Sequence, residues 1–319
     1  MKRVLLAVLL MLFAPLLFVS APPAAAATDP VAATNGFLVD PDSVPNTWVA
    51  AHPGDARAAT IKANIGDRPI AKWFTQSSGP TIGQAVGAYV GRAQNAGKLP
   101  VLVAYNLPGR DACGGHSSGG APSDAAYRTW IAAFASAIGA RPALVVLEPD
   151  AFGDYSCMDD SQVAARRALL QFATNQLGTR ATGTWTYLDA GNAGWIAAAT
   201  MAGYLADAGL ASIHGFAVNV SNYYPTGASA NYAGQINAAL GSGAKPFVID
   251  TGRNGNGHNG EWCNPPGRKI GTPPRLGGGA EMLLWIKTVG ASDGLCGIAP
   301  DTPAGTFDPA LAMRLIQGT

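Results

Sequence analysis

The chain has 319 residues, of which 13% are charged, and its formal net charge is +1. This balance offers no basic stripe that could follow a phosphate backbone, so nucleic acid is not an expected partner. The 40 glycines and 23 prolines indicate many ordered loops, and because the glycines have no period of three, a collagen-like chain is excluded.

The N-terminal segment predicts the compartment. Lys2 and Arg3 precede an almost wholly apolar run over residues 4–19, and small residues follow as far as Ala27. This order is typical of a secretory signal peptide. We therefore expect residues 1–27 to be removed and the protein to be secreted into the extracellular space. An uncleaved N-terminal anchor stays open as the alternative, although the run is short for a membrane span.

The remaining chain, residues 28–319, has the length of a single α/β barrel domain and is not expected to contact a membrane after cleavage. Short apolar runs rich in Val, Ile and aromatic residues alternate in it with longer segments of helical period. We predict strands over residues 70–74, 101–105, 143–147, 184–188, 215–220, 246–249 and 282–286. Because these runs are continuously apolar, they suit a sheet that is covered on both faces.

Helices are predicted between these strands from their capping residues. Thr81 and Ser123 offer side-chain acceptors for the free N–H groups at a helix start. Gly97 and Gly139 can end these two helices, because glycine tolerates a left-handed turn. Further helices are expected from Ser161, from Asn192 and over residues 230–240. Repeated strand–helix alternation predicts an α/β fold with a parallel sheet, most simply a barrel.

Acidic residues recur where the predicted strands end, although the chain has only 20 Asp plus Glu. In an α/β barrel the carboxyl ends of the strands form one face, and active sites lie there. The acids in these positions are Asp111, Glu148, Asp150, Asp189, Asp250 and Asp293. Glycoside hydrolysis needs such a cluster, because one carboxylic acid protonates the leaving oxygen while another group activates water or attacks. Each acid alone could be a cap or an ion-pair partner, but their common placement favours catalysis.

Aromatic residues offer platforms on which the apolar faces of sugar rings can stack. The candidates are Trp48, Trp73, Trp185, Trp195, Trp262, Tyr105, Tyr223 and Tyr224. Packing in the core is the alternative for most of these rings, since Tyr and Trp bury readily. The expected substrate-binding residues are Tyr105, Trp48, Trp195 and Trp262, with Asn222 and Lys287, which follow two of the predicted strands.

Other chemistries lack their motifs. The sequence has no HExxH pair, and its four histidines are dispersed, so neither a metal site nor a cofactor is expected. A non-catalytic carbohydrate-binding module is the strongest rival interpretation. Such a module would share the aromatic residues, but it would not need acids at several strand ends, and it is usually a smaller β-sandwich.

The four cysteines are expected to form disulfides in an exported protein. Three pairings are possible. We choose Cys113–Cys157 and Cys263–Cys296, because neighbouring cysteines close the shortest loops. A metal site is the alternative, but the sequence contains no CxxC.

Several of these segments, in order along the chain, resemble glycoside hydrolase family 6, the inverting cellulases. Residues 103–113, VAYNLPGRDAC, are similar to a family signature V-x-Y-x-x-P-x-R-D-C, with Ala112 as an extra residue before the cysteine. Residues 145–150, VVLEPD, resemble a second signature, an apolar strand followed by E-P-D. Further similar stretches lie at residues 116–120, 250–257, 261–264, 285–287 and 292–294. The resemblance covers the chain from about residue 35 to its end.

The resemblance implies a distorted, incomplete, TIM-like (β/α) barrel and inversion at the anomeric carbon. It also implies that Asp111 is the general acid, that Asp150 is a supporting carboxylate, and that Asp293 is the base, acting directly or through a water chain. Lys287 and Trp262 would line glucosyl subsites. The family's two disulfides agree with the pairing chosen above, and no cofactor is implied.

The expected function is that of a secreted, monomeric endo-β-1,4-glucanase that acts on cellulose or soluble β-1,4-glucans. The compact length leaves little room for the long loops that roof the tunnel of processive relatives, which favours internal cuts. Two positions depart from the family: Ala291 stands where a glutamate is usual, and Thr75 follows Trp73-Phe74 near an expected aspartate. A weakly active or non-catalytic glucan-binding member and a cellobiohydrolase stay open as alternatives.

Overall fold

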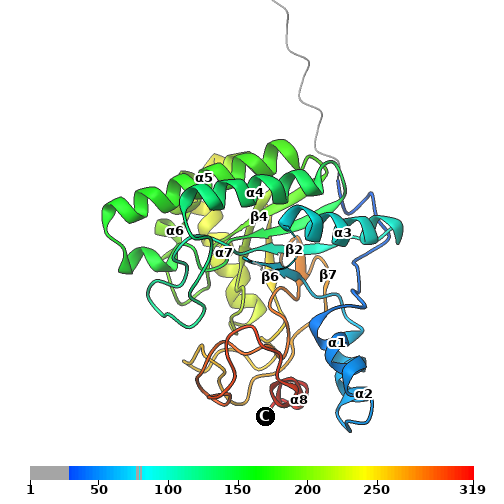
Figure 1. Cartoon of the computed structure of the whole chain (residues 1–319). Helices are drawn as coiled ribbons and strands as arrows, with labels where there is room; N and C mark the ends of the chain where they lie inside the picture. The colour runs from blue at the N-terminus through cyan, green and yellow to red at the C-terminus, as the bar shows by residue number, and fades with distance from the viewer. Residues whose placement is uncertain (1–28, 77–78, 80) are drawn as a thin grey trace, which may run out of the picture.

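Eight strands form one curled sheet in the computed structural model, which describes residues 29–76, 79 and 81–319 (Figure 1). The expected signal peptide, residues 1–27, lies outside the described residues, and the start of the domain at residue 28 stays a prediction. Within the described ranges, no helix combines the length and the apolar character that a membrane crossing needs.

The strand order along the sheet is β1-β2-β3-β4-β5-β6-β8-β7, and every pair is parallel except β7 with β8. The strands are β1 (Lys72–Phe74), β2 (Val101–Ala104), β3 (Ala143–Leu147), β4 (Thr184–Asp189), β5 (Gly215–Val218), β6 (Phe247–Asp250), β7 (Arg275–Leu276) and β8 (Met282–Leu284). All seven predicted strands are confirmed in position, with ends that agree within two residues. The two-residue β7 is exposed and antiparallel, and no apolar run predicts it.

Among the described residues, β1 and β7 remain the two edges of the sheet. The gap beside β1 is bridged locally: the N–H of Ala71 donates to the carbonyl of Trp285 at 2.9 Å. The indole N–H of Trp73 donates to the carbonyl of Ile286 at 2.8 Å. The first strand therefore approaches the end of β8 without forming a ladder with it. The predicted α/β fold with a distorted, incomplete parallel barrel is confirmed.

Helices cover the outer face of the sheet (Figure 1). The longer helices are α3 (Ile82–Asn95), α4 (Asp124–Ile138), α5 (Asp160–Arg180), α6 (Ala198–Asp207) and α7 (Thr226–Leu240). The helices α1 (Val44–Ala51), α2 (Ala58–Ile61) and α8 (Pro309–Gln317) lie near one another, with a π-helical turn, Lys62–Gly66, after α2. Short 3₁₀ turns span Gly153–Cys157, Leu210–Ser212 and Gly241–Gly243.

Two predicted caps are confirmed, and the three further predicted helices are present but begin at other residues than expected. The hydroxyls of Thr81 and Ser123 accept the capping N–H bonds of α3 and α4. Helix α5 is capped by Asp159, whose carboxylate accepts from two backbone N–H groups, and Ser161 already lies inside it. Asn192 closes a turn by accepting from the N–H of Gly194 at 3.0 Å, so α6 begins only at Ala198. Helix α7 begins at Thr226, one turn before residue 230.

The core has two layers because successive strand residues point to opposite faces of the sheet. In β2 and β3, Leu102 and Val145 pack outward against the helices. Val101, Val103 and Leu144 pack into the interior of the half-barrel. Both strands are buried along their whole length, which explains why their sequences are continuously apolar.

Both predicted disulfides are confirmed. Cys113–Cys157 and Cys263–Cys296 link residues 44 and 33 positions apart. The first bridge joins the loop after β2 to the 3₁₀ turn Gly153–Cys157, and the second joins the loops after β6 and β8. Each bridge therefore braces loops at the carboxyl end of the sheet.

Replacing both Cys113 and Cys157 by serine is expected to lower the free energy of unfolding by about 4 kcal/mol, since the bridge removes loop-closure entropy from the unfolded chain. Urea unfolding monitored by fluorescence measures this loss. The Cys263→Ser/Cys296→Ser variant is the matched comparison, and its shorter loop should give a slightly smaller loss. Equal stability of the Cys113→Ser/Cys157→Ser variant and the wild type would contradict the expectation.

Candidate active site

A cavity of about 1100 Å³ lies at the carboxyl ends of the strands. Its lining contains most of the site residues predicted from the sequence, namely Tyr105, Asp111, Asp150, Trp195, Asn222, Trp262, Lys287 and Asp293. Trp48 is the exception. It packs in a cluster with Ile61 and Trp285 and stacks on His52 at 4.8 Å, so the structure places it in the packing of α1 and not in the cleft.

The backbone turns sharply where the strands enter the cleft. Within the part of the chain that the structure describes, six non-glycine residues have positive φ: Asp111 (56°), Glu148 (48°), Asp150 (67°), Asn219 (66°), Ser221 (59°) and Asn264 (44°). Each of them lies in a loop at the carboxyl end of the sheet. The left-handed backbone conformation is unfavourable for residues with a Cβ. Residues in this conformation are common at functional sites, where a side chain must point in a particular direction.

Asp150 is the acid best suited to hold a proton. It is partly open to the cleft, yet the surrounding protein buries its carboxyl group, and this burial raises its pKa to about 7. Lys287 acts in the opposite direction, while the negative charges of Asp111, Asp154 and Asp293 raise the pKa further. A carboxylic acid with such a pKa remains largely protonated in mildly acidic solution and can donate to a leaving group.

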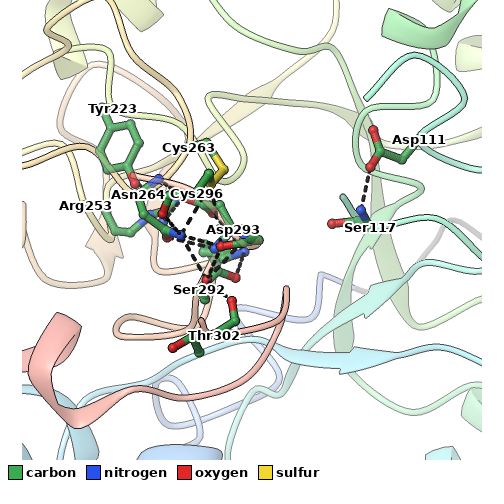
Figure 2. Close-up of a disulfide and its surroundings, with 12 residues drawn as sticks. Asp111, Ser117, Tyr223, Arg253, Cys263, Asn264, Ser292, Asp293, Cys296 and Thr302 are labelled. Carbon is green, nitrogen blue, oxygen red and sulfur yellow. Dashed lines mark hydrogen bonds and ion pairs between the residues drawn. A yellow bond between two sulfur atoms is a disulfide. The ribbon is translucent and has the colours of Figure 1, made fainter. Parts of the chain in front are cut away.

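Asp111 lies on the loop after β2, and its Oδ2 accepts a hydrogen bond from the N–H of Ser117 (Figure 2). The adjacent Arg110 points to other partners. Its guanidinium donates to the carbonyls of Ser117 at 2.9 Å and Tyr105 at 3.1 Å, and it lies over the Tyr105 ring, 4.3 Å from the centroid. Asp111 lines the cleft, and its negative charge raises the pKa of Asp150.

Asp293 is held as an ion. Its Oδ2 accepts from Arg253 at 2.8 Å, from the Tyr223 hydroxyl at 3.0 Å and from the N–H of Asn264 at 3.1 Å. Lys287 Nζ lies 3.1 Å from its Oδ1. Burial would raise the pKa of Asp293, but Arg253 and Lys287 outweigh it and hold the pKa well below its usual range. Figure 2 shows this cluster beside the Cys263–Cys296 bridge, with Asp111 at a distance from it.

Three further acids end strands and are buried. Glu148 accepts from the N–H groups of Asn106 and Leu107, and burial raises its pKa to about 7. Asp189 accepts from the N–H of Asp150 at 3.0 Å, and burial and the charge of Asp150 hold its pKa well above its usual range. Burial also raises the pKa of Asp250. The sequence shows that all three acids stand at strand ends, but they are not among the residues predicted for the site.

The aromatic lining differs from the predicted set. Trp195 and Trp262 are 45% and 49% exposed, as binding platforms require. Trp73 also lines the cleft and meets Tyr105 edge-on, with 5.2 Å between the ring centroids. Its place near the end of the predicted strand over residues 70–74 is the feature of the sequence that points to the cleft. Tyr223 is only 2% exposed, and its hydroxyl donates to Asp293, so its ring is not a platform for a sugar.

Two glycines make room for these rings. A Cβ on Gly153 would lie 1.7 Å from the indole of Trp195, and a Cβ on Gly194 would lie 1.8 Å from the Tyr224 hydroxyl. Both glycines are therefore required for the rings to lie against the backbone beside the cleft. The 3₁₀ turn that holds Gly153 also carries Cys157, so the first disulfide supports the Trp195 platform.

The two departures from the family both face the cleft. Thr75 and Ala291 line it, and Ala291 is 3% exposed. Among the described residues, His116, Cys263 and Cys296 bring ligand atoms within 4.8 Å of one another. Because both sulfurs form a disulfide, this group has no thiolate to offer a metal ion.

Comparisons with known proteins match this chain to one family. The model of "Glycosyl hydrolases family 6" matches residues 34–319. Endoglucanase 1 of Streptomyces halstedii is 56% identical over 307 residues, covering 95% of both chains. Endoglucanase 1 of Streptomyces sp. (strain KSM-9) is 43% identical over 280 residues, covering 86% of this chain and 76% of that protein.

Solved structures agree with this match. The endoglucanase Cel6 from Mycobacterium tuberculosis, solved in complex with methyl-cellobiosyl-4-deoxy-4-thio-β-D-cellobioside, has a TM-score of 0.82 and 37% identity. The match covers 91% of this chain and 99% of that one. Endoglucanase CEL6B from Humicola insolens has a TM-score of 0.75 at 24% identity, which is a likeness of fold alone.

Proposed function

Because this chain belongs to glycosyl hydrolase family 6 and is therefore a glycoside hydrolase of the cellulase type, we propose that it is a secreted endo-β-1,4-glucanase that inverts the anomeric carbon. One observation carries the proposal. A partly open carboxylic acid with a raised pKa, Asp150, shares a cleft with a permanently ionised carboxylate, Asp293. Two carboxyl groups whose pKa values are pushed apart are the arrangement that acid-assisted hydrolysis requires.

We assign the general acid to Asp150 and a supporting role to Asp111, which exchanges the roles implied by the sequence resemblance. The raised pKa of Asp150 keeps the proton that the glycosidic oxygen must receive. Asp111 contributes negative charge that raises this pKa. Its own carboxyl group accepts a hydrogen bond from the N–H of Ser117.

Asp293 orients and polarises the attacking water in this proposal. Its low pKa makes it a weak base, so the proton leaves through further water molecules, as in the water-chain alternative of the sequence prediction. Lys287 and Arg253 neutralise its charge, and Lys287 also lines the cleft. In an inverting enzyme the water must fit between this carboxylate and the sugar.

The substrate is proposed from the cleft and from the relatives. Exposed Trp195 and Trp262, together with Trp73 and Tyr105, suit a row of glucosyl rings. The thio-linked cello-oligosaccharide in the Mycobacterium tuberculosis structure supports a β-1,4-glucan. The name endoglucanase on the similar relatives supports internal cuts. Ala291 in place of a glutamate leaves one sugar contact fewer.

The reaction products test both parts of the proposal. On soluble β-1,4-glucan the viscosity should fall steeply for each new reducing end, because internal cuts shorten the chains fastest. Proton NMR at early times should show the α-anomer released from the β-linked substrate. Early release of the β-anomer would overturn inversion. A slow viscosity loss with steady release of cellobiose would favour the cellobiohydrolase alternative.

Secretion and a monomeric state belong to the same proposal. The order of basic, apolar and small residues before Ala27 supports export, and two disulfides suit an oxidising compartment. N-terminal sequencing of protein recovered from the culture medium should begin near residue 28, and gel filtration should give the mass of one chain. A start at Met1 in a membrane fraction would support the uncleaved anchor.

A further inference from the structure

The carboxylate of Asp250 receives four backbone hydrogen bonds at the end of β6. Its Oδ1 accepts from the N–H of Gly252 at 2.9 Å and from that of Ile286 at 3.2 Å. Its Oδ2 accepts from the N–H of Lys287 at 2.9 Å and from that of Ser221 at 3.1 Å. Asp250 is 2% exposed, and the residues that line the cleft do not include it.

These four donors belong to three different loops, which follow β5, β6 and β8. The same loops hold the two cations that contact Asp293. Lys287 donates its backbone N–H to Asp250 and places its Nζ 3.1 Å from Asp293. Arg253 follows Asp250 by three residues, and its guanidinium donates both to Asp293 and to the carbonyl of Ser221. Asp250 thus contacts Lys287 directly and is linked to Arg253 through Ser221.

We propose that Asp250 is a positioning residue for the reaction: it ties the loops that carry Lys287 and Arg253 together and so holds both cations against Asp293. It acts only through these residues, because it does not reach the cleft. The inference rests on the proposed role of Asp293 in orienting water.

An aspartate is required at this position because all four partners are donors. Asparagine at position 250 would place its NH₂ group opposite two backbone N–H groups in either orientation of the amide. Two of the four bonds would be lost, and the buried donors would be left without an acceptor. The loop that carries Lys287 has a donor on each oxygen of Asp250, so it would move away in both cases.

Asp250→Asn is expected to lower kcat by about 10²-fold, the loss typical of a small misplacement of reacting groups, with KM changed by less than about threefold. The pH profile gives a second readout. Asp293 is faced by Arg253, Lys287, Tyr223 and Asn264, and the negative charge of Asp150, which lines the same cleft, also acts on it. When Lys287 moves away, the pKa of Asp293 rises, so the acid limb of kcat should shift to higher pH.

Asp308→Ala is the matched control. Asp308 also accepts backbone N–H groups, from Ala310 at 2.7 Å and Leu311 at 3.4 Å, but it caps α8 and does not line the cleft. This variant should lower Tm and leave kcat and the acid limb unchanged. If Asp250→Asn behaves in the same way, Asp250 has a structural role only and the proposal is wrong. Should Asp250→Asn fail to fold, Asp250→Glu keeps the charge and should show a smaller loss of kcat with the same shift of the acid limb.

A double-mutant cycle with Lys287→Met separates this inference from the proposed function. In the Lys287→Met background, Asp250→Asn should lower kcat by less than about threefold, because the residue through which it acts is already gone. Full additivity would overturn the inference. If Lys287→Met and Asp293→Asn both keep the wild-type kcat, the role of Asp293 fails instead. If these two lose activity and Asp250→Asn does not, the role of Asp250 fails alone.

Discussion

Asp150→Asn is expected to lower the turnover of polymeric β-1,4-glucan by about 10²–10⁴-fold, the contribution typical of a positioned general acid. The amide keeps the size of the side chain but has no acidic proton for the leaving oxygen. Aryl glycosides with good leaving groups need little protonation, so their turnover should fall much less. Initial rates on the two substrate types, compared with the wild type, measure the difference.

The pH profile adds a test of the same residue. Because Asp150 must be protonated to act and its pKa is raised to about 7, wild-type activity should fall as the pH rises through about 7. Asp150→Asn should remove this alkaline limb.

Asp111→Asn is the comparison that separates the two assignments. If Asp111 supports Asp150, its neutralisation removes a negative charge that raises the pKa of Asp150. The alkaline limb should then move to lower pH while the enzyme stays active. Loss of the alkaline limb in Asp111→Asn, with Asp150→Asn nearly unaffected, would restore Asp111 as the acid.

Asp293→Asn is expected to reduce turnover of polymeric and aryl substrates alike, because both need an oriented water. It should also lower the free energy of unfolding at pH 7 by about 3–5 kcal/mol, the usual loss when one partner of a buried ion pair is removed. Asp293, Arg253 and Lys287 have side chains only 5%, 3% and 13% exposed, so the remaining cations are poorly solvated. Urea unfolding and steady-state kinetics measure the two effects.

The pH dependence of this stability loss has a defined sign. The pKa of Asp293 is depressed in the folded protein, so its stabilisation is fully present above the unfolded pKa of about 3.9 and is lost as the pH falls toward the folded pKa. The stability difference between wild type and Asp293→Asn should therefore be constant from pH 7 to about 5 and shrink below about 4. Adding Lys287→Met should recover part of the stability but none of the activity. A difference that grows at low pH would contradict the ion-pair account.

The predictions for Asp150 and Asp293 depend on contacts that no local pattern in the sequence specifies. Asp111 and Asp150 each follow a strand and each stand in a recognisable motif, so the sequence could place both in the site but could not divide the acid role between them. The division depends on burial and on neighbouring charges, which come from Lys287 and Asp293 more than 130 positions further along the chain. A pKa is a property of the assembled site.

The aromatic residues show the same limit. Trp48 and Trp73 are both tryptophans near an apolar segment, but Trp48 packs beside α1 and Trp73 lines the cleft. The faces they present depend on how α1 and β1 dock on the rest of the chain. The cap of α5 and the start of α6 differ from the prediction for local reasons. Asp159, two residues before Ser161, is the acceptor that caps α5, and α6 has no side-chain cap that the sequence could show.

The sequence by itself determined the strand–helix order, the parallel sheet, the disulfide pairs and the end of the sheet at which the acids gather. These features follow from local apolar runs, from the shortest cysteine loops and from the rule that parallel strands share one carboxyl end. Only the tertiary structure decided which acid keeps its proton, which is held as an ion and which, like Asp250, ties loops together. Protonation and hydrogen bonding depend on groups from distant strands, because electrostatic interactions act through space and not along the chain.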